Sequence, residues 1–263
     1  MIDGPNEINA PPGISPVALV TGGARRIGLR ISERLAGAGY AVVLHCSGAS
    51  KDEAERAAAR IEAAGGRAAA LSLDLSDAAA TSVLIAKAGA LFGPLTLLVN
   101  NASVFKDDGA LDFDIEGFDR HFAVNLRAPA VLARDFARQA PEGACASIVN
   151  IIDQRVLRLT PQFFSYTLSK AALWAATLTM AQAFAPQGVR VNAVGPGPVF
   201  PNASEGEAGF KREVQGLPLG RAVDPDDIAD AVLYLARARN VTGQMIAVDA
   251  GQHLAWNTTD IAS

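Results

Sequence analysis

Three side chains in the second half of the chain, Asp153, Tyr166 and Lys170, are of types that transfer protons. Tyr166 and Lys170 lie four residues apart in a stretch without helix breakers, so one face of a helix presents both side chains. A nearby ammonium favours the phenolate, and we therefore expect Lys170 to lower the pKa of Tyr166 from its usual value of about 10. Tyr166 is thus predicted to be a proton donor, and Lys170 the group that tunes it.

Asp153 stands thirteen residues before Tyr166, directly after the apolar run 148–152. A hydroxyl there would polarise a carbonyl group, whereas a carboxylic acid suits proton delivery to a ring nitrogen. Burial raises the pKa of a carboxyl group and nearby cations lower it, so the direction of the shift stays open if Lys170 and Arg26 are close. The alternative is a solvated aspartate at the end of a strand.

The elements that must position these residues alternate between short apolar runs and helical stretches. The runs that we interpret as strands are 17–20, 41–45, 68–73, 95–99, 147–152, 190–194 and 245–248. Continuous apolar strands joined by crossover helices are typical of a parallel sheet covered on both faces. We therefore predict a single-domain α/β protein with a doubly wound, Rossmann-type parallel sheet of about seven strands, which binds ligands beyond the carboxyl ends of its strands.

The predicted organisation is a flexible arm at 1–15, rich in glycine, proline and polar residues, and a dinucleotide-binding and catalytic domain at 16–263. Within that domain, 198–216 is polar and long for a connection, so we expect a substrate loop that closes over the site. A surface insertion is the alternative. Helices are expected at 118–138 and 163–184, among others.

Composition favours small-molecule chemistry. The 23 basic and 27 acidic residues of the 263 are interspersed without a Lys/Arg block, which argues against nucleic acid or a membrane as partner. There are only two cysteines, and residues 1–5 lack the features of a signal peptide, so a cytoplasmic location is expected. No apolar run is long enough to cross a bilayer, and no His, Cys or Asp grouping has metal-ligand spacing.

A glycine-rich turn, Thr21-Gly-Gly-Ala-Arg-Arg-Ile-Gly28, follows the first strand, where it would hold a dinucleotide diphosphate at the start of a helix. In arrangement and spacing, this turn, Asn100-Asn-Ala102 and Tyr166-Thr-Leu-Ser-Lys170 resemble the motifs of the short-chain dehydrogenase/reductase family. The resemblance implies a nicotinamide cofactor and hydride transfer. It also implies a homodimer or homotetramer, in which the alanine-rich faces of 118–138 and 163–184 would pack between subunits.

Two departures from the usual family pattern narrow the resemblance. Arg26 replaces a glycine of the turn, and Asp153 replaces a serine. With Asn101-Ala-Ser103-Val-Phe105, they resemble the pteridine reductases and bacterial dihydromonapterin reductases, which reduce pterins and folates. This branch implies Arg26 near the cofactor phosphates and pterin, Ser103 at the cofactor or substrate edge, and Phe105 over the pterin ring. The alternative for Phe105 is an aromatic residue of the core.

The predicted site residues follow from the motifs and from this resemblance, which also implies that Lys170 holds the nicotinamide ribose and that Asn125 fixes a helix and a water path. The catalytic set is Asp153, Tyr166, Lys170 and Asn125, and the substrate contacts are Arg26, Ser103, Phe105, Asp153 and Tyr166. The cofactor contacts are Gly22, Arg25, Arg26, Ile27, Gly28, His45, Ser47, Asp74, Leu75, Asn101, Ala102, Ser103, Tyr166, Lys170, Pro196 and Gly197.

The end of the second strand, His45-Cys-Ser-Gly-Ala-Ser-Lys51, indicates the cofactor. NAD enzymes usually place an acid there on the ribose 2′-hydroxyl. Here there is none, and Ser47, Ser50, Lys51 and the arginines of the turn can meet a phosphate, so NADPH is predicted. The pteridine reductase pattern has an arginine at about the position of Cys46, and His45 has the alternative of packing at the strand end without a ligand.

The predicted function is NADPH-dependent reduction of a pterin or folate, at the C=N bond of a dihydropterin. Two alternatives remain open. One is a carbonyl reductase for ketones or 3-oxoacyl substrates, for which serine at position 153 would be the better residue. The other is a nucleotide-binding sensor without turnover, since this fold can bind nucleotide without chemistry.

Overall fold

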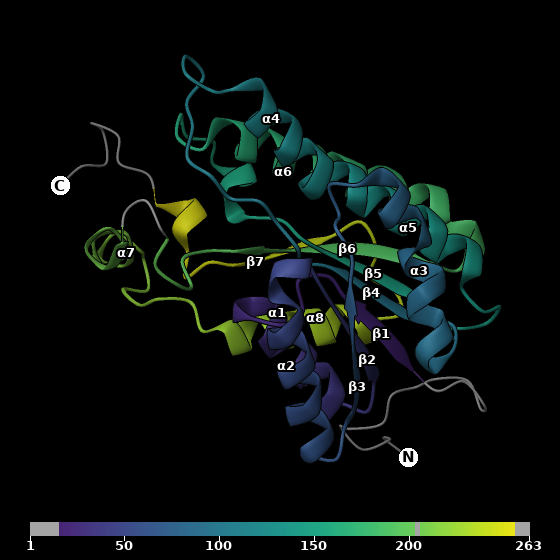
Figure 1. Ribbon diagram of the computed structural model, residues 1–263. Helices are drawn as coiled ribbons and strands as arrows, with labels where there is room; N and C mark the ends of the chain where they lie inside the picture. Colours follow the sequence, from purple (N-terminus) through teal and green to yellow (C-terminus); the bar gives the residue numbers. More distant parts are fainter. Residues whose placement is uncertain (1–15, 203–205, 256–263) are drawn as a thin grey trace.

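The computed structural model describes residues 16–202 and 206–255, so the arm predicted at 1–15 lies outside the described residues. A parallel sheet with the order β3-β2-β1-β4-β5-β6-β7 runs through the centre of the molecule (Figure 1). Its order reverses direction between β1 and β4, as in a doubly wound, Rossmann-type fold, and the predicted fold class is confirmed. The strands are β1 (Val17–Val20), β2 (Ala41–Cys46), β3 (Arg67–Ser72), β4 (Leu97–Asn100), β5 (Ser147–Ile151), β6 (Arg190–Pro196) and β7 (Met245–Val248).

Helices cover both faces of the sheet (Figure 1). Helices α1 (Arg26–Gly37), α2 (Lys51–Ala63) and α8 (Pro225–Arg237) pack on one face. Helices α3 (Ala78–Phe92), α5 (Ala128–Gln139) and α6 (Phe164–Phe184) pack on the other, with α4 (Ile115–Phe122) against α6. Short helical turns occur at η1 (Gly48–Ser50), η3 (Gln154–Leu157), η4 (Ala185–Gln187) and η5 (Gln252–Leu254).

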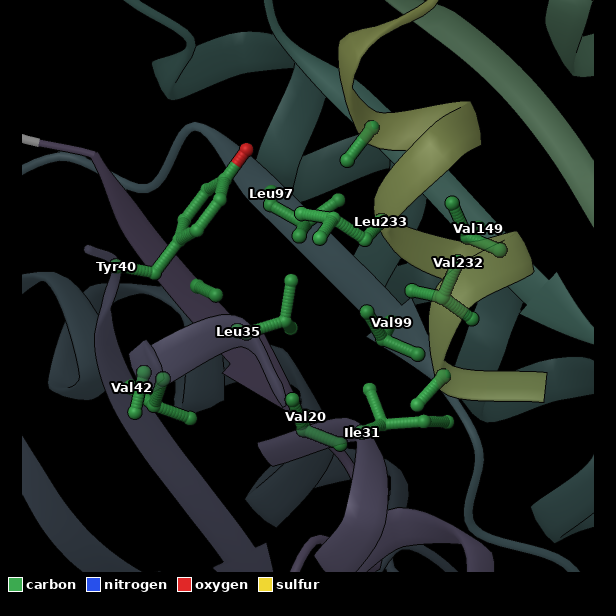
Figure 2. Close-up of a cluster of buried hydrophobic side chains, with 14 of the residues drawn as sticks. Val20, Ile31, Leu35, Tyr40, Val42, Leu97, Val99, Val149, Val232 and Leu233 are labelled. Atoms are coloured by element: carbon green, nitrogen blue, oxygen red, sulfur yellow. The ribbon is translucent and has the colours of Figure 1, made fainter. Parts of the chain in front are cut away.

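Each face of the sheet has its own hydrophobic core. Val20 of β1 packs with Ile31 of α1 and Val232 of α8 on one face (Figure 2). On the opposite face, Leu19 belongs to a second cluster with Phe136 of α5. Both sides of β1 are therefore buried, which explains why its sequence is continuously apolar rather than alternating.

The predicted strands are all present, and their bounds differ from the structure by at most two residues at either end. The helix predicted at 118–138 is interrupted. Between α4 and α5, residues Ala123–Arg127 form a π-helical segment, η2. Pro129 lies in the first turn of α5, where it has no N–H to donate to the carbonyl of Asn125, so the regular hydrogen-bond ladder cannot continue through this point.

The connection at 198–216 is more regular than expected. It contains helix α7 (Gly206–Gln215), whereas an irregular loop was predicted. Residues 207–215 include no proline and several strong helix formers, among them Glu207, Lys211 and Glu213, and this local preference decides the conformation. Helix α7 lies beyond the strand ends, away from the two helical layers (Figure 1).

Candidate active site

A cavity of about 760 Å³ lies at the carboxyl ends of the central strands. Every predicted site residue except Asn125 lines it. These residues are Gly22, Arg25, Arg26, Ile27, Gly28, His45, Ser47, Asp74, Leu75, Asn101, Ala102, Ser103, Phe105, Asp153, Tyr166, Lys170, Pro196 and Gly197. Residues more than 170 positions apart in the chain thus share one cavity, because the parallel sheet brings the ends of its strands together.

The turn after β1 is compact. Gly22 adopts a positive φ of 62°, and a Cβ on Gly28 would lie 2.1 Å from the carbonyl oxygen of Gly22. Helix α1 starts directly after this turn, and no side chain of the residues that the structure describes caps its first N–H groups. The open N–H groups and the absence of a Cβ at Gly28 are the features that a diphosphate group requires.

Asn101 and Thr21 hold this turn against the end of β4. The Asn101 side-chain amide donates hydrogen bonds to the carbonyl oxygens of Thr21 at 2.8 Å and Gly22 at 3.1 Å. In return, the Thr21 hydroxyl oxygen accepts from the backbone N–H groups of Asn101 at 2.9 Å and Ala102 at 3.0 Å. The motif at 100–102 therefore acts through the backbone of the turn.

His45 supports the same turn. Its Nδ1 accepts a hydrogen bond from the Gly22 N–H at 3.4 Å, so Nε2 carries the proton and donates to the Leu73 carbonyl oxygen at 3.0 Å. Burial lowers the pKa of His45 to about 4, and its ring is neutral at neutral pH. Although His45 lines the cavity, it brings no charge to a phosphate there. Lys51 does not line the cavity and lies 3.7 Å from the carboxylate of Glu55.

The three proton-transferring side chains meet at the floor of the cavity. The Tyr166 hydroxyl donates a hydrogen bond to Oδ2 of Asp153 at 2.9 Å. Asp153 follows β5, and its Oδ1 caps η3 by accepting from the Arg155 N–H at 2.8 Å. The Lys170 Nζ donates to the carbonyl oxygen of Ile151 at 2.8 Å and lies 5.7 Å from the centre of the Tyr166 ring.

Burial is the main cause of the pKa shifts of these three side chains. It raises the pKa of Asp153, against the opposing effects of the Arg155 N–H and guanidinium. The direction that the sequence left open is therefore upward. The opposing cations are Arg155 and, as expected, Lys170, but not Arg26. The prediction that Lys170 lowers the pKa of Tyr166 was wrong: burial and the Asp153 carboxylate raise it well above its usual value, and burial lowers the pKa of Lys170 to about 8.

An aromatic and cationic stack beside Asp153 was missed from the sequence. Phe105 stacks on Phe163 with ring centres 4.4 Å apart, and it meets Tyr166 edge-on at 4.7 Å. The Arg155 guanidinium lies over the other ring of the pair, 5.1 Å from the centre of Phe163. Phe105 is 44% exposed, which rules out the alternative of a core aromatic. In the sequence, the position of Arg155 two residues after Asp153 could have indicated that this arginine lies beside the site.

Asn125 lies behind the cavity wall, on the π-helical segment. Its Oδ1 accepts from the Val104 N–H at 2.8 Å, and its Nδ2 donates to the Val104 carbonyl oxygen at 3.0 Å and to Ser169 at 3.0 Å. The Ser103 hydroxyl also donates to Oδ1 at 3.2 Å. Asn125 thus positions the segment that carries Ser103 and Phe105, a contact that the sequence did not indicate.

Side chains tie the segment after β6 to the rest of the site. The Arg26 guanidinium lies 5.1 Å from the Phe200 ring centre and donates to the Pro201 carbonyl oxygen at 3.5 Å. On α7, the Glu213 carboxylate accepts from the side-chain amide of Gln252 at 2.8 Å. Both Glu213 and Gln252 line the cavity. Neither residue was predicted from the sequence, because only the folded position of α7 beyond the strand ends brings Glu213 next to Gln252 in the cavity wall.

Comparisons with known proteins agree with this architecture. A family model described as enoyl-(acyl carrier protein) reductase matches residues 22–253. An uncharacterized oxidoreductase of Methylorubrum extorquens is 37% identical over 242 residues, covering 89% of this chain and 96% of the relative. The chain belongs to the short-chain dehydrogenase/reductase family. The motif with Tyr166 and Lys170 is one of those that suggested this family from the sequence. The protein is an oxidoreductase.

Two further matches lie in different parts of the family. The crystal structure of FolM alternative dihydrofolate reductase 1 from Brucella canis, complexed with NADP, is 50% identical with a TM-score of 0.89, covering 94% of this chain and 97% of that one. This match fits the predicted pteridine reductase-like branch. The 3-oxoacyl-(acyl-carrier-protein) reductase FabG of Staphylococcus aureus is 30% identical over 241 residues, covering 90% of this chain and 98% of the relative.

Two properties of the described residues bear on other kinds of function. Across 16–202 and 206–255, none of the helices combines the length and apolar character needed to span a bilayer. Within the same ranges, no group of three or more His, Cys, Asp or Glu side chains is arranged to hold a metal ion.

Proposed function

We propose that this short-chain dehydrogenase/reductase uses NADPH to reduce the C=N bond of a dihydropterin or folate. The observation that carries the proposal is the hydrogen bond between the Tyr166 hydroxyl and the Asp153 carboxyl group at the floor of the cavity. Because burial raises the pKa of Asp153, this carboxyl group holds its proton closer to neutral pH than an exposed aspartate does. A carboxylic acid at this position suits proton delivery to a ring nitrogen.

The cofactor end of the cavity fits NADPH. The compact turn and the uncapped start of α1 would hold the diphosphate group. Ser47 and Ser50, which follow β2, line the cavity, as does Arg25 of the turn after β1. No acid follows β2 at the position for an unphosphorylated ribose. When bound, NADPH supplies the hydride. The related Brucella protein was solved with NADP, which supports the same cofactor here.

The substrate end offers a face for a flat ring. Phe105 presents exposed ring surface to the cavity, and stacking there would contribute about 0.5 to 1.5 kcal/mol beyond area burial. Arg26 and Ser103, which also line the cavity, would contact the polar edge of the ring. This arrangement lies next to Asp153 because Phe105 meets Tyr166 edge-on.

The protein residues would then supply one proton to the substrate ring. Protonated Asp153 would donate it to the ring nitrogen beside the carbon that is reduced, while the Tyr166 hydroxyl orients the carboxyl group. The Lys170 ammonium would stabilise the resulting carboxylate, since the two groups interact favourably when charged. In this arrangement Lys170, held by the Ile151 carbonyl, would also contact the nicotinamide ribose.

NADPH oxidation by the purified protein tests the proposal, with 7,8-dihydropterins and 7,8-dihydrofolate beside a ketone panel and an NADH control. Turnover confined to the pterins and folate would support it. Turnover on ketones alone would exclude it. NADPH binding without oxidation of any substrate would instead support a nucleotide-binding sensor.

The second candidate is a carbonyl reductase for ketones or 3-oxoacyl substrates. The similarity to the Staphylococcus aureus 3-oxoacyl reductase favours it, and Tyr166 with Lys170 would serve either reaction. Asp153→Ser separates the two candidates. A pterin reductase should lose activity in this variant, whereas a carbonyl reductase should keep or gain it, because a hydroxyl polarises a carbonyl group better than a carboxylate does.

We also propose a homodimer or homotetramer in the cytoplasm. Leu168 and Leu178 of α6 are 39% and 44% exposed, on a helix that is apolar enough to pack against a second copy. Light scattering coupled to size-exclusion chromatography tests the assembly, and a monomer at micromolar concentration would exclude it.

A further inference from the structure

Arg155 is a charged residue in the cavity whose guanidinium lacks some of its hydrogen-bond partners. It lines the cavity and is half-buried. Its Nη1 donates to the Thr160 hydroxyl, and its Nε is buried without a hydrogen-bond partner. Among the residues that the structure describes, no carboxylate forms an ion pair with Arg155, and its Nη2 donates no hydrogen bond. A guanidinium in such a place is stabilised when an anion completes its partners.

The aromatic stack holds this guanidinium at a defined distance from the ring site. Arg155 lies 5.1 Å from the centre of Phe163, and Phe163 lies 4.4 Å from the centre of Phe105. Phe105 in turn offers the surface on which we place the substrate ring. Two aromatic rings, Phe163 and Phe105, therefore separate the cation from the substrate ring. The cation is too far away to contact that ring, but a long side chain on the substrate can reach it.

Two other charged groups that line the cavity, Arg26 and Glu213, are engaged with protein. Arg26 contacts Phe200 and Pro201, and the Glu213 carboxylate accepts a hydrogen bond from Gln252. Arg155 also lowers the pKa of Asp153, through its backbone N–H, which donates to Oδ1, and through the charge of its guanidinium, which acts on Asp153 without a hydrogen bond and leaves Nη2 available. A carboxylate is the group that a planar guanidinium binds best, through two parallel hydrogen bonds.

We propose that Arg155 determines substrate specificity by binding the carboxylate of a side chain carried by the substrate ring. The preferred substrate class is therefore folate-like, with an anionic tail, rather than a pterin whose side chain bears only hydroxyl groups. This inference rests on the proposed reduction of a pterin or folate, and it adds the part of the substrate that Arg155 recognises.

The test compares kcat/KM for 7,8-dihydrofolate and 7,8-dihydrobiopterin in wild-type protein, Arg155→Met and Arg155→Lys. Methionine keeps an apolar stem against Phe163 and removes the charge, while lysine keeps the charge and loses the planar fork. Because both substrates use Asp153, the ratio of the two kcat/KM values cancels any effect of Arg155 on that carboxyl group. Arg134→Gln, which removes an exposed charge on α5, is the matched control.

In Arg155→Met the KM for dihydrofolate should rise about ten- to a hundredfold, as expected for a lost hydrogen bond between charged groups. The KM for dihydrobiopterin should stay within about twofold, and Arg155→Lys should fall between wild type and Arg155→Met. Unchanged NADPH affinity and melting temperature would show that the variants fold.

Three results would overturn the inference. Equal losses on both substrates would assign Arg155 to the support of Asp153 or the fold, and no loss on either would leave it without a role in binding. In both cases the proposed function would stand, since the wild-type protein reduces the substrates. If wild-type protein reduces neither compound, the proposed function fails first, and this inference fails with it.

Discussion

At the cofactor end of the cavity the wall is largely backbone, whereas at the substrate end it is built from side chains. The turn at 21–28 is held by the Asn101 amide and the neutral His45 ring, and a single added carbon at Gly28 would overlap the chain. At the substrate end, Asp153, Arg155 and the Phe105–Phe163 pair rest on one another. Backbone geometry suits a cofactor that is shared across a family, and side chains can change with the substrate.

The two ends also differ electrostatically. The cofactor end would hold a diphosphate with backbone N–H groups, and the His45 ring that supports the turn is neutral, so the geometry of this end should change little near neutral pH. The substrate end buries three ionisable groups together, and burial shifts the pKa of Asp153 and Tyr166 upward and of Lys170 downward. Perturbed groups of this kind are typical of the place where chemistry occurs. Changes at one end should therefore leave the other nearly intact.

The largest effect is expected at Asp153. Asp153→Asn and Asp153→Ala should lower kcat for pterin reduction about a hundred- to ten-thousandfold, because the general acid is lost. NADPH binding, followed by fluorescence titration, should be unchanged. Asp230→Asn on α8, an exposed aspartate, serves as control. Full activity in Asp153→Ala would exclude its role in proton delivery.

The same residue predicts a pH dependence. Since the protonated carboxyl group is the donor, activity should be level at low pH and fall as pH rises through the raised pKa of Asp153. Above that point the rate should drop about tenfold per pH unit. The profile of kcat against pH checks this, and NADPH affinity over the same range should stay constant. A rate that rises with pH would contradict the assignment.

At the cofactor end, Gly28→Ala should weaken NADPH binding about 5- to 150-fold, the usual range for overpacking, because its Cβ would lie 2.1 Å from the Gly22 carbonyl oxygen. Gly37→Ala, in the same helix, is the matched control, because a Cβ there would meet no atom of the other described parts of the chain within 4 Å. Isothermal titration measures both. Equal affinity in the two variants would contradict the compact turn.

His45 should make the fold sensitive to acid. Its pKa is lowered to about 4, so the unfolded chain binds a proton before the folded protein does, and stability is full above pH 6.5 and falls toward pH 4. Between pH 7 and pH 5 the free energy of unfolding should fall by about 2 kcal/mol because of this group. His45→Gln, which keeps one acceptor and one donor, should remove that part of the loss. Urea unfolding of both proteins at the two pH values measures it, and identical losses would contradict the assignment.

The smallest effect is expected where α7 meets η5. Gln252→Ala removes the hydrogen bond to Glu213 and should raise the substrate KM about two- to tenfold, if this contact keeps α7 over the cavity. NADPH affinity should not change. Gln244→Ala provides the control, because within the described ranges that side chain donates only to the Thr242 carbonyl oxygen in its own loop. An unchanged KM would argue against a closing role of the segment 198–216.

Much of the fold could be predicted because the central strands β1, β2, β4, β5 and β6 are buried along their whole length and therefore appear as largely apolar runs. The glycines of the turn were visible for a similar reason, since only glycine allows the backbone approach at Gly28. The π-helical segment was not visible, although Pro129 marks its end, because a proline early in a helix usually reads as a helix start. Helix α7 was missed because the polar composition of 198–216 outweighed its helix formers.

By itself the sequence determined the fold class, the cofactor turn and the identities of Asp153, Tyr166 and Lys170, since these depend on local periodicity, glycine and spacing. Only the tertiary structure decided the pKa directions, the support role of Asn125 and the stack of Arg155, Phe163 and Phe105. The pKa of Tyr166 depends on how much water is removed from its hydroxyl and on which carboxylate lies nearby. The four-residue spacing to Lys170 gives information on neither. Burial is a property of the whole packed chain, and it decides which of these groups holds the proton.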